Sequence, residues 1–350
     1  IASNFDIYCD DTKNADEIST VPVVIKDTKQ HKVWFKMDDY FKKPKLCVKL
    51  RVISPKLIDT VTSRNYTELI NEILDDGLAV YTYAFEEANV FYKIFTEDDA
   101  LIFSFNGYND KLYKLVETVL KFFSELKISK EKYNINYEKM KRDIESKKKS
   151  QPYKHSMAME AYMLESDTFR PIDIENDFNS NITYEGILKH YKEMFKTIFV
   201  ETLIYGNINK NTADIYINYI DKYLIKKSQN VYDYKLIKSK RKGLLKLPQK
   251  GNEYQLRFKC PNKDEINSCI TNKYFYCVDT YKDNAIMKIF THLIDSPFYD
   301  DLRTKKQLGY IVWSYSDNTS SYLNVGVDIQ GNKVDPANMD KEIEAFFDSF

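Results

Sequence analysis

Short runs of alternating apolar and polar residues mark the start of the chain, and longer runs at helical spacing follow them. Three alternating runs within 22–54, rich in β-branched and aromatic residues, predict strands. Residues 89–107 predict a hairpin around an acidic turn, whereas 58–88 predicts a long helix. Mixed strands and helices in this order indicate an α+β unit.

The remainder of the first unit is mainly helical. Its apolar spacing predicts helices over 109–126, 130–148, 154–165, 184–198 and 211–225. A β-branched run at 199–206 predicts a strand between the last two helices.

A similar order begins again beyond residue 252. Runs at 254–260 and 268–278 predict strands, 282–295 predicts a helix, and 310–315 and 322–330 predict two further strands. This repetition indicates a tandem duplication. The final stretch, 340–350, predicts a helix whose apolar face carries Ile343, Phe346, Phe347 and Phe350. We expect that face to lack packing partners and to promote self-association.

The composition excludes some classes of protein. The 350 residues are 43% hydrophobic, with 52 basic and 52 acidic side chains, and this balance argues against nucleic-acid binding. No apolar run approaches 18 residues, so we expect no membrane span. The five cysteines form no CxxC pair, which indicates reduced thiols and favours the cytoplasm, with secreted and organellar locations left open. The first residue is not Met, and we expect a fragment.

Candidate metal ligands are sparse. Only four histidines occur, and His190 with Glu193 forms half of an inverted His-x-x-Glu-His motif. Helical projection places His190 beside the apolar face and Glu193 on the polar side, so we expect a surface pair and not a metal site. His31 is expected in a turn. No GxSxG, P-loop or GxGxxG motif occurs, and the residues alone predict no complete active site.

The segment SPFYDDLRTKKQLGY, residues 296–310, is the most distinctive in the chain. A helical run is expected to end at Gly309, which tolerates positive φ, with a strand starting immediately afterwards. Arg303 precedes this corner and Tyr310 follows it. By local chemistry alone, the expected interpretation is a structural corner only.

Several segments in order resemble one family. They are VIKDTKQHKVWFKMDDYFKKPK at 24–45, GYNDK at 107–111, QPYKHSM at 151–157, YGNINK at 205–210 and the 296–310 segment. Together they resemble the C-terminal half of the insulin-degrading enzyme-like (pitrilysin/insulinase) zinc metallopeptidases. The resemblance implies two tandem homologous α+β domains, each a mainly antiparallel sheet packed with helices, the second truncated. The implied divisions are a linker and lead-in at 1–25, a third-domain-like domain at 26–235, a basic connection at 236–252 and a partial fourth-domain-like domain at 253–350.

The resemblance also implies a function. The full-length protein would be a zinc metalloendopeptidase that degrades peptides in an enclosed chamber, with zinc bound by an absent N-terminal half and none by this segment. This segment would supply chamber wall and would be inactive alone. By motif match, Tyr310 and Arg303 would reach the catalytic centre, and Tyr299 would line the substrate cleft. The implied partners are peptide substrates, the N-terminal half of the same protein and a second copy in a homodimer, but neither nucleic acid nor membrane.

Two alternatives remain open. One is a catalytically inactive, peptidase-like scaffold or partner subunit that binds peptides or protein. The other is a polyanion-binding module centred on the basic residues 235–250, although the balanced charge disfavours it.

Overall fold

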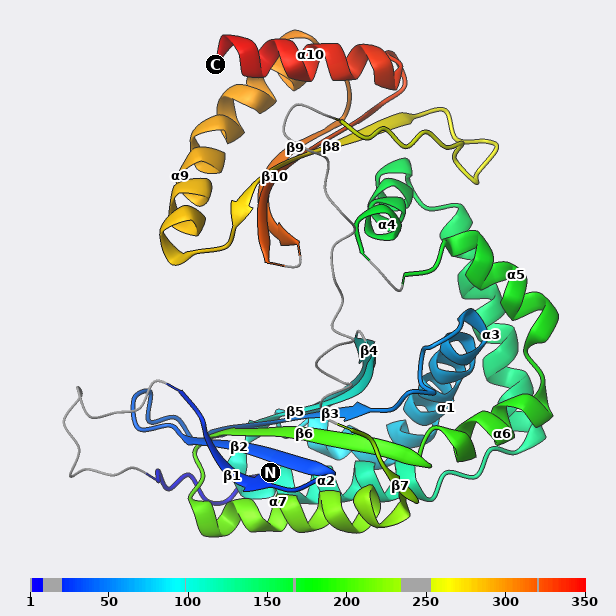
Figure 1. Ribbon diagram of the computed structural model, residues 1–350, viewed down its shortest axis with the longest axis vertical. Coiled ribbons are helices and arrows are strands. Elements are labelled where there is room, and N and C mark those ends of the chain that lie inside the picture. Colours follow the sequence, from blue (N-terminus) through cyan, green and yellow to red (C-terminus); the bar gives the residue numbers. More distant parts are fainter. Residues whose placement is uncertain (1, 9–20, 98, 166–167, 234–252, 320) are drawn as a thin grey trace. The chain divides into compact units, whose positions relative to one another are not determined.

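The computed structural model describes residues 2–8, 21–97, 99–165, 168–233, 253–319 and 321–350, which form two compact units (Figure 1). The first unit comprises the described parts of 1–141 and 174–241, and the second comprises those of 142–173 and 242–350. Both combine helices with mainly antiparallel sheets, so the α+β prediction is confirmed. None of the helices in these ranges is both long and apolar enough to cross a membrane.

The first unit is built on a seven-stranded sheet. Its order is β1-β2-β6-β3-β5-β4, with β7 paired to β6, and only the β2–β6 and β6–β7 pairs are parallel. The strands are β1 (Val23–Asp27), β2 (His31–Met37), β3 (Lys45–Ile53), β4 (Val90–Glu97), β5 (Ala100–Tyr108), β6 (Thr197–Gly206) and β7 (Asn230–Val231). The helices associated with this unit are α1 (Val61–Glu86), α2 (Asn109–Ser124), α3 (Lys130–Lys148), α5 (Pro171–Asn181), α6 (Tyr184–Glu193) and α7 (Lys210–Tyr223), with a short 3₁₀ turn η2 (Ile225–Lys227).

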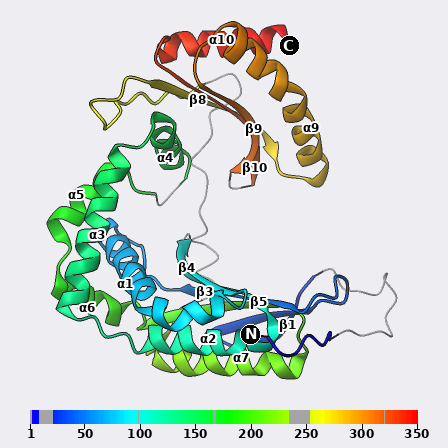
Figure 2. The ribbon, with the colours of Figure 1, turned by 180° about the vertical axis from the view of Figure 1, so that it is seen from behind.

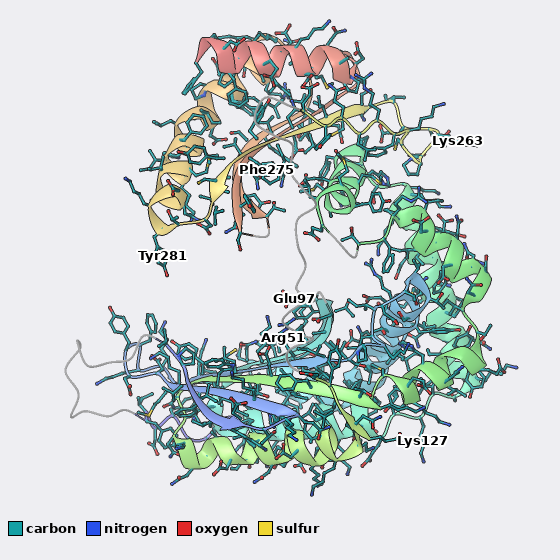
Figure 3. All side chains as sticks on the ribbon, in the orientation of Figure 1. Arg51, Glu97, Lys127, Lys263, Phe275 and Tyr281 are labelled. Atoms are coloured by element: carbon teal, nitrogen blue, oxygen red, sulfur yellow. The ribbon has the colours of Figure 1, made fainter. Side chains whose placement is uncertain are left out.

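The two faces of this sheet differ in polarity. Alternate residues of β3, such as Leu46, Val48 and Leu50, are buried, and α2 and α7 lie along one face in both views (Figures 1 and 2). Figure 3 shows Arg51 and Glu97 on the other face, where Arg51 pairs with Asp99 and Glu201. The period of two along a strand therefore leaves this unit with one apolar, helix-covered face and one polar face.

The second unit is a smaller three-layer arrangement. Its antiparallel sheet has the order β8-β10-β9. Its elements are α4 (Pro152–Leu164), β8 (Ser268–Val278), α9 (Tyr281–Phe298), the π-helical segment η3 (Tyr299–Lys305), β9 (Ile311–Thr319), β10 (Tyr322–Gly331) and α10 (Pro336–Ser349).

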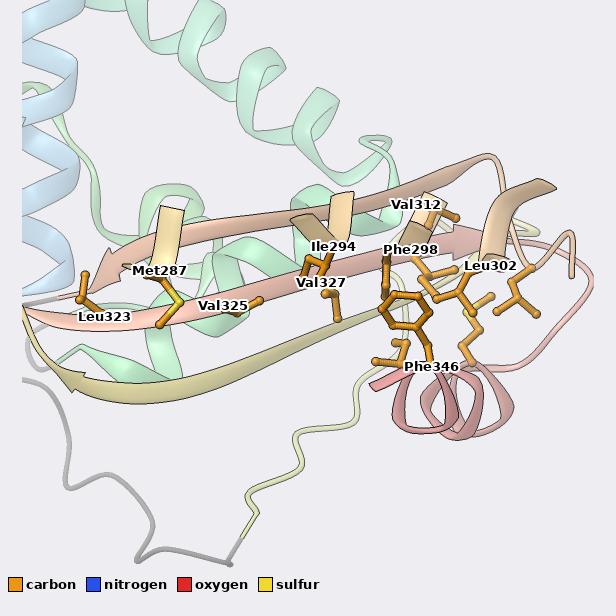
Figure 4. Close-up of a cluster of buried hydrophobic side chains, with 13 residues drawn as sticks. Met287, Ile294, Phe298, Leu302, Val312, Leu323, Val325, Val327 and Phe346 are labelled. Atoms are coloured by element: carbon orange, nitrogen blue, oxygen red, sulfur yellow. The ribbon is translucent and has the colours of Figure 1, made fainter. Parts of the chain in front are cut away.

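Strand β10 separates the two faces of this sheet. Its odd-numbered residues from Leu323 to Ile329 pack with α9, η3 and α10 in an apolar core (Figure 4). Its even-numbered residues include Asp328 and Gln330, which face the opposite layer, where α4 hydrogen-bonds to the sheet. The sequence division assigns all of 26–235 to one domain, but the structure groups α4 with the second unit, where it contacts β8 and β10.

Several sequence predictions of element boundaries need correction. Residues 254–260 form no strand, and no described strand pairs with them to satisfy their backbone. Helix α6 ends at Glu193 rather than at 198, and α5 was not predicted. His31 begins β2 and does not lie in a turn. The basic connection 236–252 and the proposed polyanion segment 235–250 lie wholly outside the described residues.

The last helix was predicted correctly, but the exposure of its apolar face was not. Ile343 and Phe346 are buried, and the Phe346 ring meets Phe298 edge-on at 5.1 Å between centroids (Figure 4). Phe347 packs against the same core, whereas Phe350 is 57% exposed. The apolar face therefore finds its partners within the second unit, and the reason given for self-association is removed.

Candidate functional site

The corner between α9 and β9 carries the two residues that the sequence singles out. Pro297 lies inside α9 and donates no backbone hydrogen bond, and the next residues widen into η3. The segment closes with Lys306 N–H donating to the Asp301 carbonyl at 2.9 Å and Leu308 N–H to the Leu302 carbonyl at 3.0 Å. The helix thus ends at Lys305, before the predicted Gly309.

Ion pairs hold this segment in place. The Lys305 ammonium lies 2.8 Å from Asp300, and Lys306 contacts both Asp301 at 2.8 Å and Glu342 of α10 at 2.9 Å. Hydrogen bonding to these carboxylates raises the pKa of both lysines. The links through Lys306 fasten the end of η3 to α10, which supports the position of the loop that follows.

Gly309 has a different role from the one predicted. The positive φ at this corner belongs to Gln307, at 53°, and not to Gly309. A Cβ on Gly309 would lie 2.1 Å from the Gln330 carbonyl oxygen and 2.6 Å from its carbon. Glycine is therefore needed here because two backbones approach closely, not because the chain turns through the left-handed region.

The corner brings Arg303 and Tyr310 together. The Arg303 Cζ lies 5.4 Å from the centroid of the Tyr310 ring, a cation–π distance. Tyr310 is 85% exposed, so its hydroxyl is open to solvent. The Arg303 Nε is buried and has no hydrogen-bond partner among the described residues, which leaves one donor of the guanidinium unsatisfied. The corner therefore places an exposed tyrosine hydroxyl beside an arginine whose Nε donor is buried and unsatisfied.

Tyr299 lies at the start of η3 and is 49% exposed. No ring contact or hydrogen bond joins it to Arg303 or Tyr310 within the described parts of the chain. An open recess of about 580 Å³ beside η3 is lined by Asp300, Lys305 and Phe346, among others, and includes none of the three candidate residues. The structure therefore joins two of the three residues and leaves Tyr299 apart.

The buried histidines serve the first unit. His190 Nε2 lies 2.8 Å from the Thr67 hydroxyl, and the imidazole stacks on Tyr66. Glu193 pairs instead with Lys196 at 2.5 Å. His31 Nδ1 contacts Asp221 at 2.8 Å and Nε2 contacts Thr202 at 3.0 Å. These contacts give the histidines structural partners.

This burial predicts an acid-sensitive first unit. Desolvation lowers the pKa of His190 to about 4, below its unfolded value of about 6.5. Because the unfolded chain binds the proton more readily, stability is lost as the pH falls from 6.5 towards 4, by about 1–2 kcal/mol at pH 5. When urea unfolding is measured at several pH values, the free energy of unfolding should depend less steeply on pH in His190→Gln than in the wild type. His155→Gln, with a side-chain contact to the Lys148 carbonyl, is the control and should keep the wild-type slope. Equal slopes in all three proteins would contradict the prediction.

One contributor to the corner is missed by sequence reasoning. Gln330 of β10 touches Gly309 through its backbone and α4 through its side chain. The sequence points to Gln330 only indirectly, because its hydrogen-bond partner Gln151 is the first residue of QPYKHSM, one of the segments that resemble the family.

Comparisons with known proteins agree on one family. Residues 1–176 match the description "Middle or third domain of peptidase_M16", and residues 289–350 match "PQQ synthase PqqF-like, C-terminal lobe domain 4". The chain is 26% identical over 340 residues to a peroxisomal insulin-degrading enzyme-like protein of Arabidopsis thaliana, covering 97% of the chain and 35% of that protein. Human insulin-degrading enzyme is 26% identical, with coverage of 94% and 32%, and human nardilysin is 26% identical, with coverage of 94% and 28%.

Solved structures show the same fold. Pitrilysin superposes with a TM-score of 0.78 at 17% identity, covering the whole chain and 35% of that structure. A protein described as a peptidase M16 inactive domain from Pseudomonas fluorescens superposes with a TM-score of 0.61 at 12% identity, with coverage of 94% and 78%. The chain spans about a third of the length of the first curated relatives that it matches.

Proposed function

Because this chain belongs to the M16 (insulinase) peptidase family, we propose that it forms the non-zinc-binding C-terminal half of a zinc metalloendopeptidase. Relatives in this family are named as insulin-degrading enzymes, nardilysin and a putative zinc protease. Since the chain spans about a third of their length, the peptidase activity belongs to a longer protein, with an N-terminal half as the partner and peptides as substrates.

The observation that carries this proposal is the pairing of Arg303 with the exposed Tyr310. Hydrolysis of a peptide bond passes through a tetrahedral oxyanion, and a fixed donor aimed at that oxygen lowers the barrier. A phenol O–H can donate there while uncharged at neutral pH. The guanidinium can donate to backbone carbonyls of the peptide through several N–H groups of fixed geometry. We assign the oxyanion contact to Tyr310 and substrate clamping to Arg303.

Zinc is proposed to bind outside this chain. The described residues contain no group of three or more His, Cys, Asp or Glu side chains that could hold a metal ion, and a catalytic zinc uses about three protein ligands. Zinc is therefore proposed to be bound by the N-terminal half, and the roles proposed for Tyr310 and Arg303 involve no step at the metal.

The chamber wall is proposed to include the polar face of the first sheet. Arg51, Asp99 and Glu201 form a charged group there, and the neighbouring Lys49 pairs with Glu97. A wall of both charge signs can hold a hydrated peptide without demanding one sequence. Tyr299, half-exposed beside the corner, is proposed as a cleft-lining residue.

Arg303→Ala in the full-length peptidase is expected to lower kcat/KM about 10-fold or more, the effect of losing charged hydrogen bonds to the substrate. Steady-state kinetics with a fluorogenic peptide measure this loss. Arg303→Lys keeps the charge but not the fork of donors, so it should recover only part of the activity. Full activity of a folded Arg303→Ala enzyme would refute the clamping role.

The 350-residue chain by itself is expected to bind far less than one zinc per molecule and to show no chelator-sensitive peptidase activity. Metal analysis of untagged protein after dialysis, with a peptide-cleavage assay, measures both. Adding an N-terminal half of the same protein is the matched positive control. One zinc per molecule together with peptide cleavage by the chain alone would contradict the proposal that zinc is bound by the N-terminal half.

A peptidase-like scaffold without catalytic activity is the second candidate. Its support is the similarity to the protein described as an M16 inactive domain. The full-length protein distinguishes the two, since a scaffold would bind peptides without cleaving them at any zinc concentration.

A further inference from the structure

Gln330 touches the backbone on both sides of Tyr310. In the antiparallel pairing of β10 with β9, Gln330 lies opposite Ile311. Its carbonyl oxygen also occupies the space where a Gly309 side chain would begin, 2.1 Å from the position of that Cβ. The residues before and after Tyr310 therefore both lie against Gln330, a residue that is only 6% exposed.

The Gln330 side chain reaches away from the corner to the start of α4. Its Oε1 accepts a hydrogen bond from the Tyr153 N–H at 3.0 Å, and its Nε2 donates to the Gln151 Oε1 at 3.0 Å. Helix α4 begins at Pro152, which has no N–H, and its N-cap residue Gln151 makes no capping bond with its side chain. Gln330 therefore caps a helix 177 residues away in sequence, satisfying a backbone donor that the helix itself leaves free.

The rest of α4 is fixed to the sheet independently of Gln330. The Ser156 hydroxyl donates to Thr271 at 2.8 Å, and Glu160 pairs with Lys273 at 2.7 Å. Tyr153 also meets Trp313 of β9 edge-on at 5.2 Å between ring centroids. Helix α4 thus offers a firm support against which Gln330 can hold the 309–311 backbone.

We infer that Gln330 is a positioning residue for Tyr310, acting through the capped N-terminus of α4, an inference that rests on the proposed function. The Gln330 side-chain amide fixes the end of β10, and the end of β10 fixes residues 309 and 311. These two residues flank Tyr310 and set the direction of its side chain. This gives the QPYKHSM segment a role in the peptidase reaction although none of its residues touches Arg303 or Tyr310.

The first test uses the 350-residue chain with Trp34→Phe, which leaves Trp313 as its one tryptophan. In this background, Gln330→Leu should speed backbone amide hydrogen exchange at residues 308–312 about 10-fold, because a buried hydrogen-bonded support is lost. It should also shift the fluorescence emission of Trp313. The matched control, Ser156→Ala, also removes one α4–sheet hydrogen bond but should leave both signals unchanged. Unchanged exchange in Gln330→Leu would overturn the inference, as would an equal change in Ser156→Ala.

The second test uses the full-length peptidase. Gln330→Leu should lower kcat about 10-fold and change KM by less than about twofold. The expected loss of kcat is smaller than the roughly 10²-fold loss that a 1 Å misplacement of a catalytic group can cause. Gln330→Glu retains the acceptor for the Tyr153 N–H, and rotation of the Gln151 amide supplies it with a donor, so turnover should recover to within about threefold. If Gln330→Leu does not fold, Gln151→Ala removes one of the two bonds and should give a smaller loss of the same kind.

Failure of the inference and failure of the proposed function give different results. If Tyr310→Phe loses turnover while Gln330→Leu keeps it, the positioning role is wrong and the proposed function stands. If Tyr310→Phe keeps full turnover, the oxyanion role proposed for Tyr310 fails, and amide exchange in the 350-residue chain still tests whether Gln330 supports the corner. Losses that multiply in the double variant would show that Gln330 acts independently of Tyr310, which would also overturn the inference.

Discussion

Tyr310→Phe in the full-length peptidase is expected to lower kcat by about 10²-fold or more, the usual loss for one oxyanion donor. The substitution removes only the hydroxyl. The ring that lies 5.4 Å from the Arg303 guanidinium remains, so the cation–π contact and the corner are retained. The variant therefore separates the hydrogen bond from the packing.

The pattern of the kinetic constants tests the assignment. A contact made only in the transition state lowers kcat and kcat/KM equally and leaves KM nearly unchanged. Tyr322→Phe is a matched control, since Tyr322 lies at the far end of β10 and loses the same group. Full turnover by a folded, zinc-loaded Tyr310→Phe enzyme would leave the corner with a structural role only.

Gly309→Ala is expected to destabilise the second unit by about 3 kcal/mol, the upper end of the usual range for overpacking. The added methyl would meet the Gln330 carbonyl at 2.1 Å and the Gly331 nitrogen at 3.1 Å. Both are backbone atoms of β10, where Gln330 pairs with β9 and β8 and Gly331 pairs with β8, so neither can rotate away as a side chain would. The strand must shift, and residue 310 shifts with it.

Urea unfolding of the 350-residue chain measures this loss, and turnover of the full-length enzyme should fall with it. Gly77→Ala is the matched control, because its new methyl meets the end of the Phe122 ring and the Lys132 ammonium, both parts of side chains that can move, and alanine favours the helical position. It should change stability by less than about 1 kcal/mol. A Gly309→Ala chain as stable as the wild type would show that the corner can adapt to a side chain.

Local pattern was enough for much of the fold, and the family resemblance selected two candidate site residues. Alternation with a period of two identified β3, whose pleat exposes alternate residues to the core, and runs rich in strand-forming residues identified β5, β8 and β10. The long helix α1 was equally clear from its spacing. Arg303 and Tyr310 could be selected because the motif that contains them is contiguous, and the α+β class followed from the order of the elements.

Tertiary structure decided what each apolar or polar face contacts. A periodic pattern shows that 340–350 has an apolar face, but only the fold supplies Phe298 and the core that bury Ile343 and Phe346. The strand predicted at 254–260 failed for the same reason, since strand formation needs a partner in space.

The residues that hold the candidate site in place were also decided by the tertiary structure. The sequence by itself indicated the family, most of the order of the elements and the candidate residues Arg303 and Tyr310, because these depend on contiguous segments. Only the tertiary structure decided that α4 packs on the polar face of β10, that Gln330 caps it from 177 positions away, and that Gly309 is required by the approach of a second backbone. Hydrogen bonds and close contacts between distant segments leave no periodic trace in a single sequence, so they become visible only once the chain is folded.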